Sequence, residues 1–159
     1  MMTTYSPLKK FAAFSFAAMV LAACAAPSYT TGSASSSASG GSASAKYLVE
    51  NVGDRVFFET DRSVLDASAR GTLVQQAEWL NQNVGINMTI EGHADERGTR
   101  EYNLALGARR ANAVRDFLIS QGVNASRLQT ISFGKERPVS LCAEESCWSK
   151  NRRSVSTIR

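Results

Sequence analysis

Residues 88–111 restrict the fold of this chain more than any other segment. The spacing of their hydrophobic residues changes from the alternation of a β-strand to the three-to-four-residue spacing of an α-helix. Met88 and Ile90 alternate with polar residues, which is typical of a half-buried strand. Gly92 interrupts the alternation, and the polar loop HADERG follows with charges of both signs. Thr99 can then cap a helix that carries two arginines. A charged loop between a strand end and such a helix suits a small ligand that bears both charges.

The rest of the domain continues this alternation of strands and helices. Asp66 is a predicted N-cap, and Gly85 and Gly122 follow the two long helical patterns as stop signals. The order predicts an α+β fold with helices packed on one face of a small mixed sheet. We predict strands at 55–59, 86–91, 128–133 and 155–158, long helices at about 66–83 and 99–121, and a helical turn around 145–151.

Residues 1–23 are predicted to be a cleaved signal peptide. Lys9 and Lys10 form a basic start, and the apolar run at 11–21 is too short to span a bilayer. The run ends in Leu-Ala-Ala-Cys, so Cys24 is predicted to become the lipid-modified first residue of the mature chain. More than one lipid chain on this cysteine gives a stable anchor. The alternative is a plain secretory signal that is cut near Ala26.

Residues 24–46 are predicted to be the lipidated N-terminus and a flexible tether. Between residues 28 and 45 the composition is almost entirely Ser, Ala, Gly and Thr, which cannot bury enough apolar area to offset the entropy of ordering. A tether of this length spans about 23 Å on average and roughly 60 Å when extended. A linker with no required length is the alternative. The folded domain is expected at residues 47–159, which is enough chain for one core.

Charge and cysteine content exclude some classes of function. The formal net charge of +4 falls to +2 when the two signal lysines are removed, and no basic stripe is present, so nucleic-acid binding is not expected. Cys142 and Cys147 remain as an even pair in an exported protein and fit a local disulfide. Two free thiols, one of them buried beside Trp148, are the alternative. Without a Cys-x-x-Cys motif, no redox function is expected.

The segments GHADERGTREYN and NLALGARRA resemble the OmpA-like peptidoglycan-binding domain, and most closely its lipoprotein members from Tol-Pal systems. The resemblance covers about residues 55–159. It implies a two-layer βαβαβ architecture with a final strand, and non-covalent binding of peptidoglycan through diaminopimelate. It also implies an outer-membrane lipoprotein that faces the periplasm, with TolB as a partner and a role in envelope integrity and cell division. Ala25, in place of an aspartate after the cysteine, resembles an outer-membrane sorting signal.

The same resemblance indicates the main binding residues. In the family, the loop aspartate and the second helix arginine hold diaminopimelate, and Asp95 and Arg110 match these positions. A carboxylate suits the ammonium of diaminopimelate, and a guanidinium fork suits its carboxylate. Helical spacing places Arg110 on one stripe with Asn103 and Leu106, bordering the cleft at the sheet end, and directs Arg109 to solvent. Leu106 can pack against the ligand's methylenes, and Asn103 can add hydrogen bonds.

An internal ion pair between Asp95 and Arg110 that only fixes the loop is the alternative. Because exposed pairs contribute little to stability, we expect the loss of either residue to abolish peptidoglycan binding and to leave thermal unfolding nearly unchanged. The same spacing assigns Leu104 and Leu118 to the face that packs on the core.

Asp61, Thr60, His93 and Thr99 complete the predicted ligand-binding set. Asp61 matches the aspartate of the family's Phe-Asp segment, but Thr60 replaces the phenylalanine, so no aromatic contact is expected from this loop. A turn-forming aspartate is the alternative for Asp61. His93 is the only histidine in the chain, and we expect it to orient its loop by hydrogen bonding rather than to bind a metal.

Neither an enzyme nor a cofactor site is predicted. The chain has no Gly-x-Ser-x-Gly elbow, no multi-histidine cluster and no recognisable Ser-His-Asp arrangement. The alternatives are a periplasmic peptidoglycan hydrolase and another OmpA-like cell-wall anchor. Asn151-Arg152-Arg153 either lines the cleft, docks a partner or ties the last strand to its neighbouring helix. Trp79 and Trp148 are interpreted as packing residues.

Overall fold

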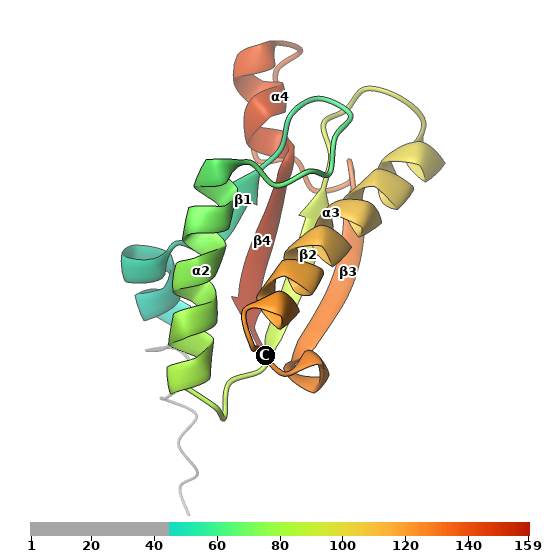
Figure 1. Cartoon of the computed structure of the whole chain (residues 1–159). Coiled ribbons are helices and arrows are strands. Elements are labelled where there is room, and N and C mark those ends of the chain that lie inside the picture. The colour runs from blue at the N-terminus through green and yellow to red at the C-terminus, as the bar shows by residue number, and fades with distance from the viewer. Residues whose placement is uncertain (1–44) are drawn as a thin grey trace, which may run out of the picture. The chain divides into compact units, whose positions relative to one another are not determined.

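The computed structural model describes residues 45–159 (Figure 1). The predicted signal peptide, Cys24 and the tether as far as residue 44 lie outside the described residues. A short π-helix, η1 (Leu48–Val52), precedes the sheet and buries Leu48. Within the described part of the chain, no helix combines the length and the apolar character needed to cross a membrane.

Four strands form one mixed sheet in the order β1-β4-β2-β3. In this sheet β2 is parallel to β3, whereas β4 is antiparallel to both β1 and β2. The carboxyl ends of β1, β2 and β3 therefore meet the amino end of β4 at one end of the sheet. The strands are β1 (Arg55–Phe57), β2 (Met88–His93), β3 (Leu128–Gly134) and β4 (Arg153–Ile158).

Two long helices, α2 (Ala67–Gln82) and α3 (Arg100–Ser120), cover one face of the sheet (Figure 1). Both begin at the predicted caps. The Asp66 carboxylate accepts a hydrogen bond from the third residue after it at 2.7 Å, and the Thr99 hydroxyl accepts one in the same way at 3.2 Å. The predicted α+β fold, with helices on one face of a small mixed sheet, is confirmed.

The strands differ from their predicted bounds near the charged loop. β2 continues through Gly92 to His93, although the glycine predicts a break. Gly92 still pairs with Ser132 and Ser154 in the sheet. Only glycine fits at this position, because α3 packs directly on it and a Cβ atom here would lie 2.6 Å from the carbonyl carbon of Gly107. β4 begins at Arg153, two residues before its predicted start, and β1 ends at Phe57.

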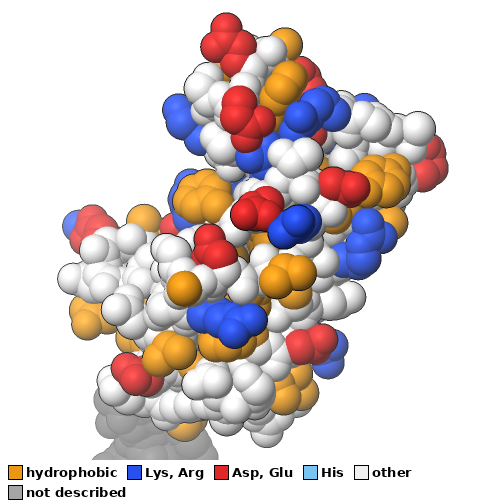
Figure 2. Space-filling view, turned by 45° about the horizontal axis from the view of Figure 1, so that its top comes forward, with side chains coloured by type: hydrophobic (Ala, Val, Ile, Leu, Met, Phe, Trp, Pro, Cys, Tyr) orange, Lys and Arg blue, Asp and Glu red, His pale blue; other side chains and the backbone are white. Residues whose placement is uncertain are grey.

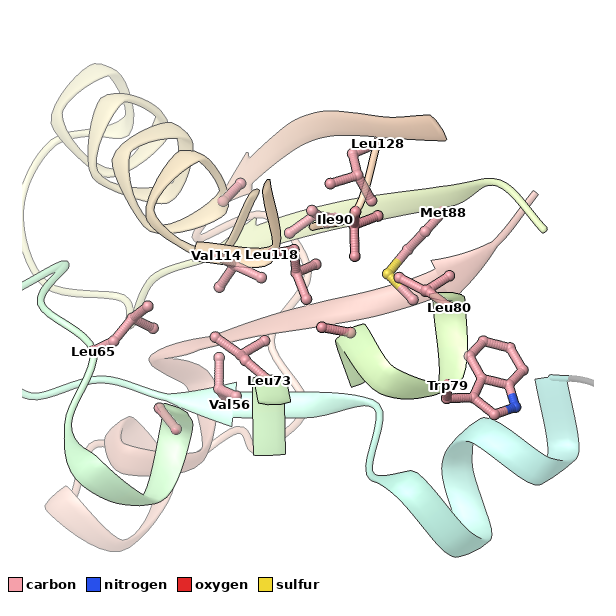
Figure 3. Packing of buried hydrophobic residues seen from close by; sticks show 14 of the residues in the cluster. Val56, Leu65, Leu73, Trp79, Leu80, Met88, Ile90, Val114, Leu118 and Leu128 are labelled. Atoms are coloured by element: carbon pink, nitrogen blue, oxygen red, sulfur yellow. The ribbon is translucent and has the colours of Figure 1, made fainter. Parts of the chain in front are cut away.

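The core lies between the helices and the sheet (Figure 3). Leu80 of α2, Val114 and Leu118 of α3 and Ile90 of β2 are buried members of this one core. Leu104 does not share this face as predicted, since 41% of its surface is exposed. The close approach at Gly107 instead turns Asn103, Leu106 and Arg110 inward at this end of the helix. Trp79 packs into the core as expected.

A 3-10 turn, η2 (Ala125–Arg127), leads into β3. The last helix, α4 (Glu145–Asn151), lies between β3 and β4 in the chain. A disulfide joins Cys142, in the segment before α4, to Cys147 in the first turn of α4, with the Cα atoms 5.6 Å apart. The predicted pairing is confirmed, and the alternative of two free thiols is wrong. Closing so short a loop contributes about 2 kcal/mol on the chain-entropy account. Because Trp148 directly follows Cys147, the bond also restricts the position of this indole.

Candidate functional site

A surface cavity of about 290 Å³ lies at the sheet end where the β1–α2 loop, the β2–α3 loop and the start of α3 meet. Figure 2 is turned toward this end of the molecule and shows acidic and basic side chains close together on it. Five of the predicted binding residues line the cavity together with three that were not predicted. The lining residues are Thr60, Asp61, Asp95, Arg97, Gly98, Tyr102, Asn103 and Leu106.

Asp95 is the carboxylate of this cavity that lies deepest, with 7% of its surface exposed. Its Oδ1 accepts from the Arg97 backbone N–H at 3.1 Å and from Nε at 3.2 Å, and its Oδ2 accepts from Nη2 at 2.7 Å. Arg152 adds a longer contact of 3.5 Å to Oδ2. Burial alone raises the pKa of Asp95, but the hydrogen bonds from Arg97 and Arg152 outweigh it and lower the pKa. The carboxylate is therefore ionised at neutral pH.

Arg110 lies within α3 with none of its surface exposed, and it is not among the residues that line the cavity. Its guanidinium donates to the backbone carbonyls of Arg62 and His93, each at 2.8 Å, and of Glu59 at 3.1 Å. Among residues 45–159, three of its five N–H groups thus have an acceptor, and two do not. The helical spacing correctly places Arg110 beside Asn103 and Leu106, but the expected position on the border of the cleft is wrong.

The charge of Arg110 is maintained despite this burial. Desolvation lowers its pKa to about 10, and the nearby Asp95 carboxylate opposes this shift. Arg110 is therefore a cation at neutral pH. The predicted alternative of a direct Asp95–Arg110 ion pair is not found in the described residues, where Asp95 pairs with Arg97 and Arg152. Contact between Arg110 and a ligand stays a prediction.

Asp61 follows β1 in a left-handed turn with φ 56°, a conformation that aspartate tolerates better than most residues. Its carboxylate also lines the cavity and accepts a hydrogen bond from the Tyr102 hydroxyl. The turn-forming alternative and a place in the cavity therefore both apply to Asp61. Tyr102 was not predicted, although it lies one helical turn before Leu106 and the spacing could have indicated it.

His93 and Thr99 lie next to the cavity without lining it. The His93 ring is buried and stacks on Phe133 at a centroid distance of 5.5 Å. Neither ring nitrogen has a hydrogen-bond partner within residues 45–159, although Nε2 lies 3.5 Å from a carboxylate oxygen of Glu91. Burial, followed by the positive charges of Arg153 and Arg137, lowers its pKa to about 4, so the ring is neutral. The ring was expected to orient the loop by hydrogen bonding. Instead, the backbone carbonyl of His93 accepts a hydrogen bond from Arg110. Thr99 serves as the helix cap.

Sequence reasoning missed the side chains that surround Arg97. The Arg97 guanidinium lies 4.2 Å from the centroid of the Trp148 ring, and the indole N–H of Trp148 donates to Glu96 at 3.0 Å. Trp148 therefore contacts Arg97, a residue of the cavity wall, and is not only a packing residue. Arg152 makes two contacts at this end of the sheet. It contacts the Asp95 carboxylate, and it donates a hydrogen bond to the backbone carbonyl of Phe58 at 3.0 Å. The charged loop and the Asn-Arg-Arg element were the signals for these contacts.

Comparison with known proteins agrees with this fold. The OmpA family matches residues 57–152, and the chain belongs to this family. The resemblance noted in the sequence is thus confirmed. A peptidoglycan-associated lipoprotein of Mesorhizobium japonicum is 63% identical over 115 residues, which cover 72% of this chain and 68% of that protein. One from Agrobacterium fabrum is 54% identical over 146 residues, covering 89% and 82%.

Solved structures give the same result. The crystal structure of the peptidoglycan-associated lipoprotein from Burkholderia pseudomallei matches with a TM-score of 0.65 and 39% identity, over 67% of this chain and 90% of that one. The C-terminal domain of Helicobacter pylori MotB matches with a TM-score of 0.62 over 67% and 84%. Its identity of 21% supports the fold alone.

Proposed function

We propose that this protein is a lipid-anchored binding module that attaches a bacterial membrane to the cell wall without enzymatic chemistry. The ligand in this proposal is peptidoglycan, held through the diaminopimelate of its stem peptide. The ionised Asp95 carboxylate in the wall of a 290 Å³ cavity carries the proposal. Membership of the OmpA family, and relatives named for their association with peptidoglycan, support it.

The chemistry of the cavity fits the zwitterionic end of diaminopimelate. Asp95 and Asp61 supply carboxylates for an ammonium, and Leu106 supplies an apolar surface for methylenes. Asn103 lines the same cavity and can hydrogen-bond the ligand through its amide oxygen, because its amide nitrogen donates to the carbonyl of Arg97 at 2.8 Å. Beneath these residues, the buried Arg110 adds a fixed positive charge that favours a ligand carboxylate at this end of the sheet.

Asp95→Asn is expected to reduce binding to purified diaminopimelate-type peptidoglycan at least tenfold in a co-sedimentation assay. The amide keeps the shape of the side chain and loses the charge that would hold the ammonium, a loss of about 1.5–3 kcal/mol. Asp116→Asn is the matched control, because Asp116 is an exposed carboxylate of the same domain outside the cavity. Undiminished sedimentation of folded Asp95→Asn would remove the assignment of Asp95 as a ligand-binding residue.

Mass spectra of muropeptides should stay unchanged after incubation with the protein, whereas a hydrolase would alter them.

We also propose an outer-membrane position through Cys24, with the domain in the periplasm as part of a Tol-Pal system that supports envelope integrity and cell division. Exposed apolar side chains on the elements around the cavity support a protein partner here. Val64 is 69% exposed in the β1–α2 loop, and Leu104 and Tyr102 are exposed on α3.

TolB is the partner in this proposal, and it should compete with peptidoglycan for this end of the domain. A saturating muropeptide is expected to weaken TolB binding at least tenfold in a titration of the two purified proteins, because both ligands would need the same loops. Equal TolB affinity with and without the muropeptide would show that the two surfaces are separate.

A further inference from the structure

We propose that Arg97 selects the ligand, because it closes Asp95 in an internal ion pair that only a ligand with both an ammonium and a carboxylate can replace without loss. This inference rests on the proposed function and adds a specificity-determining residue to it. Of the three guanidiniums close to Asp95, that of Arg97 is the one that lines the cavity. Arg110 and Arg152 are buried, whereas 39% of the Arg97 side chain is exposed.

The ion pair between Arg97 and Asp95 occupies the position that a ligand ammonium needs. Arg97 supplies three of the hydrogen bonds to this carboxylate, and the remaining contact from Arg152 is 3.5 Å long. An ammonium therefore reaches Asp95 fully only when the Arg97 side chain moves. A ligand with an ammonium alone would exchange one ion pair for another and leave the guanidinium without a partner, so its net gain is small.

A ligand with both charges changes this balance. Its ammonium takes the Asp95 carboxylate, and its carboxylate takes the released fork of Arg97, so that two charge-assisted pairs replace one. The Arg97–Asp95 pair thus weakens the binding of a ligand with an ammonium alone and allows tight binding of a ligand with both charges. Specific sites commonly combine both effects. Diaminopimelate has both groups at its side-chain end, whereas lysine has the ammonium alone.

The surroundings of Arg97 keep its guanidinium at the cavity after Asp95 is released. Its face lies over the Trp148 ring at 4.2 Å, and Trp148 is held by its bond to Glu96 and by the adjacent disulfide. The Asn103 amide fixes the backbone carbonyl of Arg97 at 2.8 Å, so only the side chain has to rotate. A second weak contact, from Nη2 to the Thr60 hydroxyl at 3.3 Å, lies on the cavity side.

Calorimetric titration of the full-length protein with two disaccharide tripeptides tests this inference. The two probes carry meso-diaminopimelate or L-lysine as the third residue and differ in one carboxylate. The wild-type protein should bind the diaminopimelate peptide at least tenfold more tightly. In Arg97→Gln the ratio should fall to threefold or less, because the lysine peptide gains affinity and the diaminopimelate peptide loses it. Arg97→Lys, which keeps the charge without the fork, should give an intermediate ratio.

Arg100→Gln is the matched control, since Arg100 lies three residues further on, is exposed and pairs with Glu136 at 3.2 Å on the surface. It should keep the wild-type ratio. An unchanged ratio in both Arg97 variants, with circular dichroism confirming the fold, would overturn the inference and leave the proposed function intact. Failure of the wild-type protein to bind either peptide would instead overturn the proposed function, and this inference with it.

Discussion

Arg110→Ala is expected to lower the free energy of unfolding by about 3–5 kcal/mol, because it opens a cavity in a fully buried site and leaves three backbone carbonyls without their donor. Those carbonyls belong to Glu59, Arg62 and His93, so one side chain joins the β1–α2 loop to the end of β2. The melting temperature, followed by circular dichroism, should fall by about 10 °C or more. This replaces the expectation from sequence that the loss of Arg110 hardly changes unfolding.

Arg109→Ala is the matched control for this variant. Arg109 is the adjacent arginine of α3, is exposed and faces the Tyr102 ring at 5.8 Å. Its removal should change stability by less than about 0.5 kcal/mol. Equal melting curves for the two variants would mean that the carbonyl contacts of Arg110 do not stabilise the domain. A loss of ligand binding in Arg110→Ala alone would not identify a ligand contact, whereas Asp95→Asn tests the cavity directly.

Gly92→Ala should be the most disruptive change of a single methyl group, with a loss of about 3 kcal/mol or more in the free energy of unfolding. The new Cβ atom would overlap the carbonyl group of Gly107, with its carbon 2.6 Å away, and backbone atoms cannot turn aside as a side chain does. Either α3 or β2 must move. Urea denaturation measures the loss, and binding should weaken as well because α3 carries Asn103 and Leu106.

Gly71→Ala is the control that separates this effect from the general effect of a methyl group. Gly71 lies within α2, and a Cβ atom there meets nothing within 4 Å. Alanine should therefore stabilise the helix by about 0.5–1 kcal/mol. If Gly92→Ala had the same free energy of unfolding as Gly71→Ala, the result would contradict the close contact between α3 and β2.

Local sequence patterns predicted the elements of this fold well. Asp66 and Thr99 cap the two long helices because a short polar side chain can bond the free N–H groups of the first turn, and this depends on neighbours only three residues away. The disulfide between Cys142 and Cys147 was equally local. The bounds of β2 were less well predicted, because Gly92 was interpreted from its backbone freedom alone. The glycine is instead needed for the close approach of α3, while the backbone of Gly92 stays paired in the strand.

The candidate site, too, was predicted only in part from the sequence. The type of charge at the sheet end followed from the HADERG loop. Asp95 and Asp61 were predicted from the family resemblance, and Asn103 and Leu106 from the helical stripe that they share with Arg110; all four line the cavity. The roles of the arginines did not follow. Helical spacing gives the direction of a side chain but not what covers it, so Arg110 was expected at the border of the cleft and Arg97 was not considered.

The sequence by itself determined the alternation of strands and helices, the capped helix starts, the cysteine pair and the presence of opposite charges at one end of the sheet. Only the tertiary structure decided which cation is buried and which faces the cavity. Arg110 is covered by carbonyls that lie 48 and 51 residues earlier in the chain, and Trp148 reaches Glu96 across 52 residues. Burial and the choice of ion-pair partner depend on such distant segments, which no local pattern of residues records.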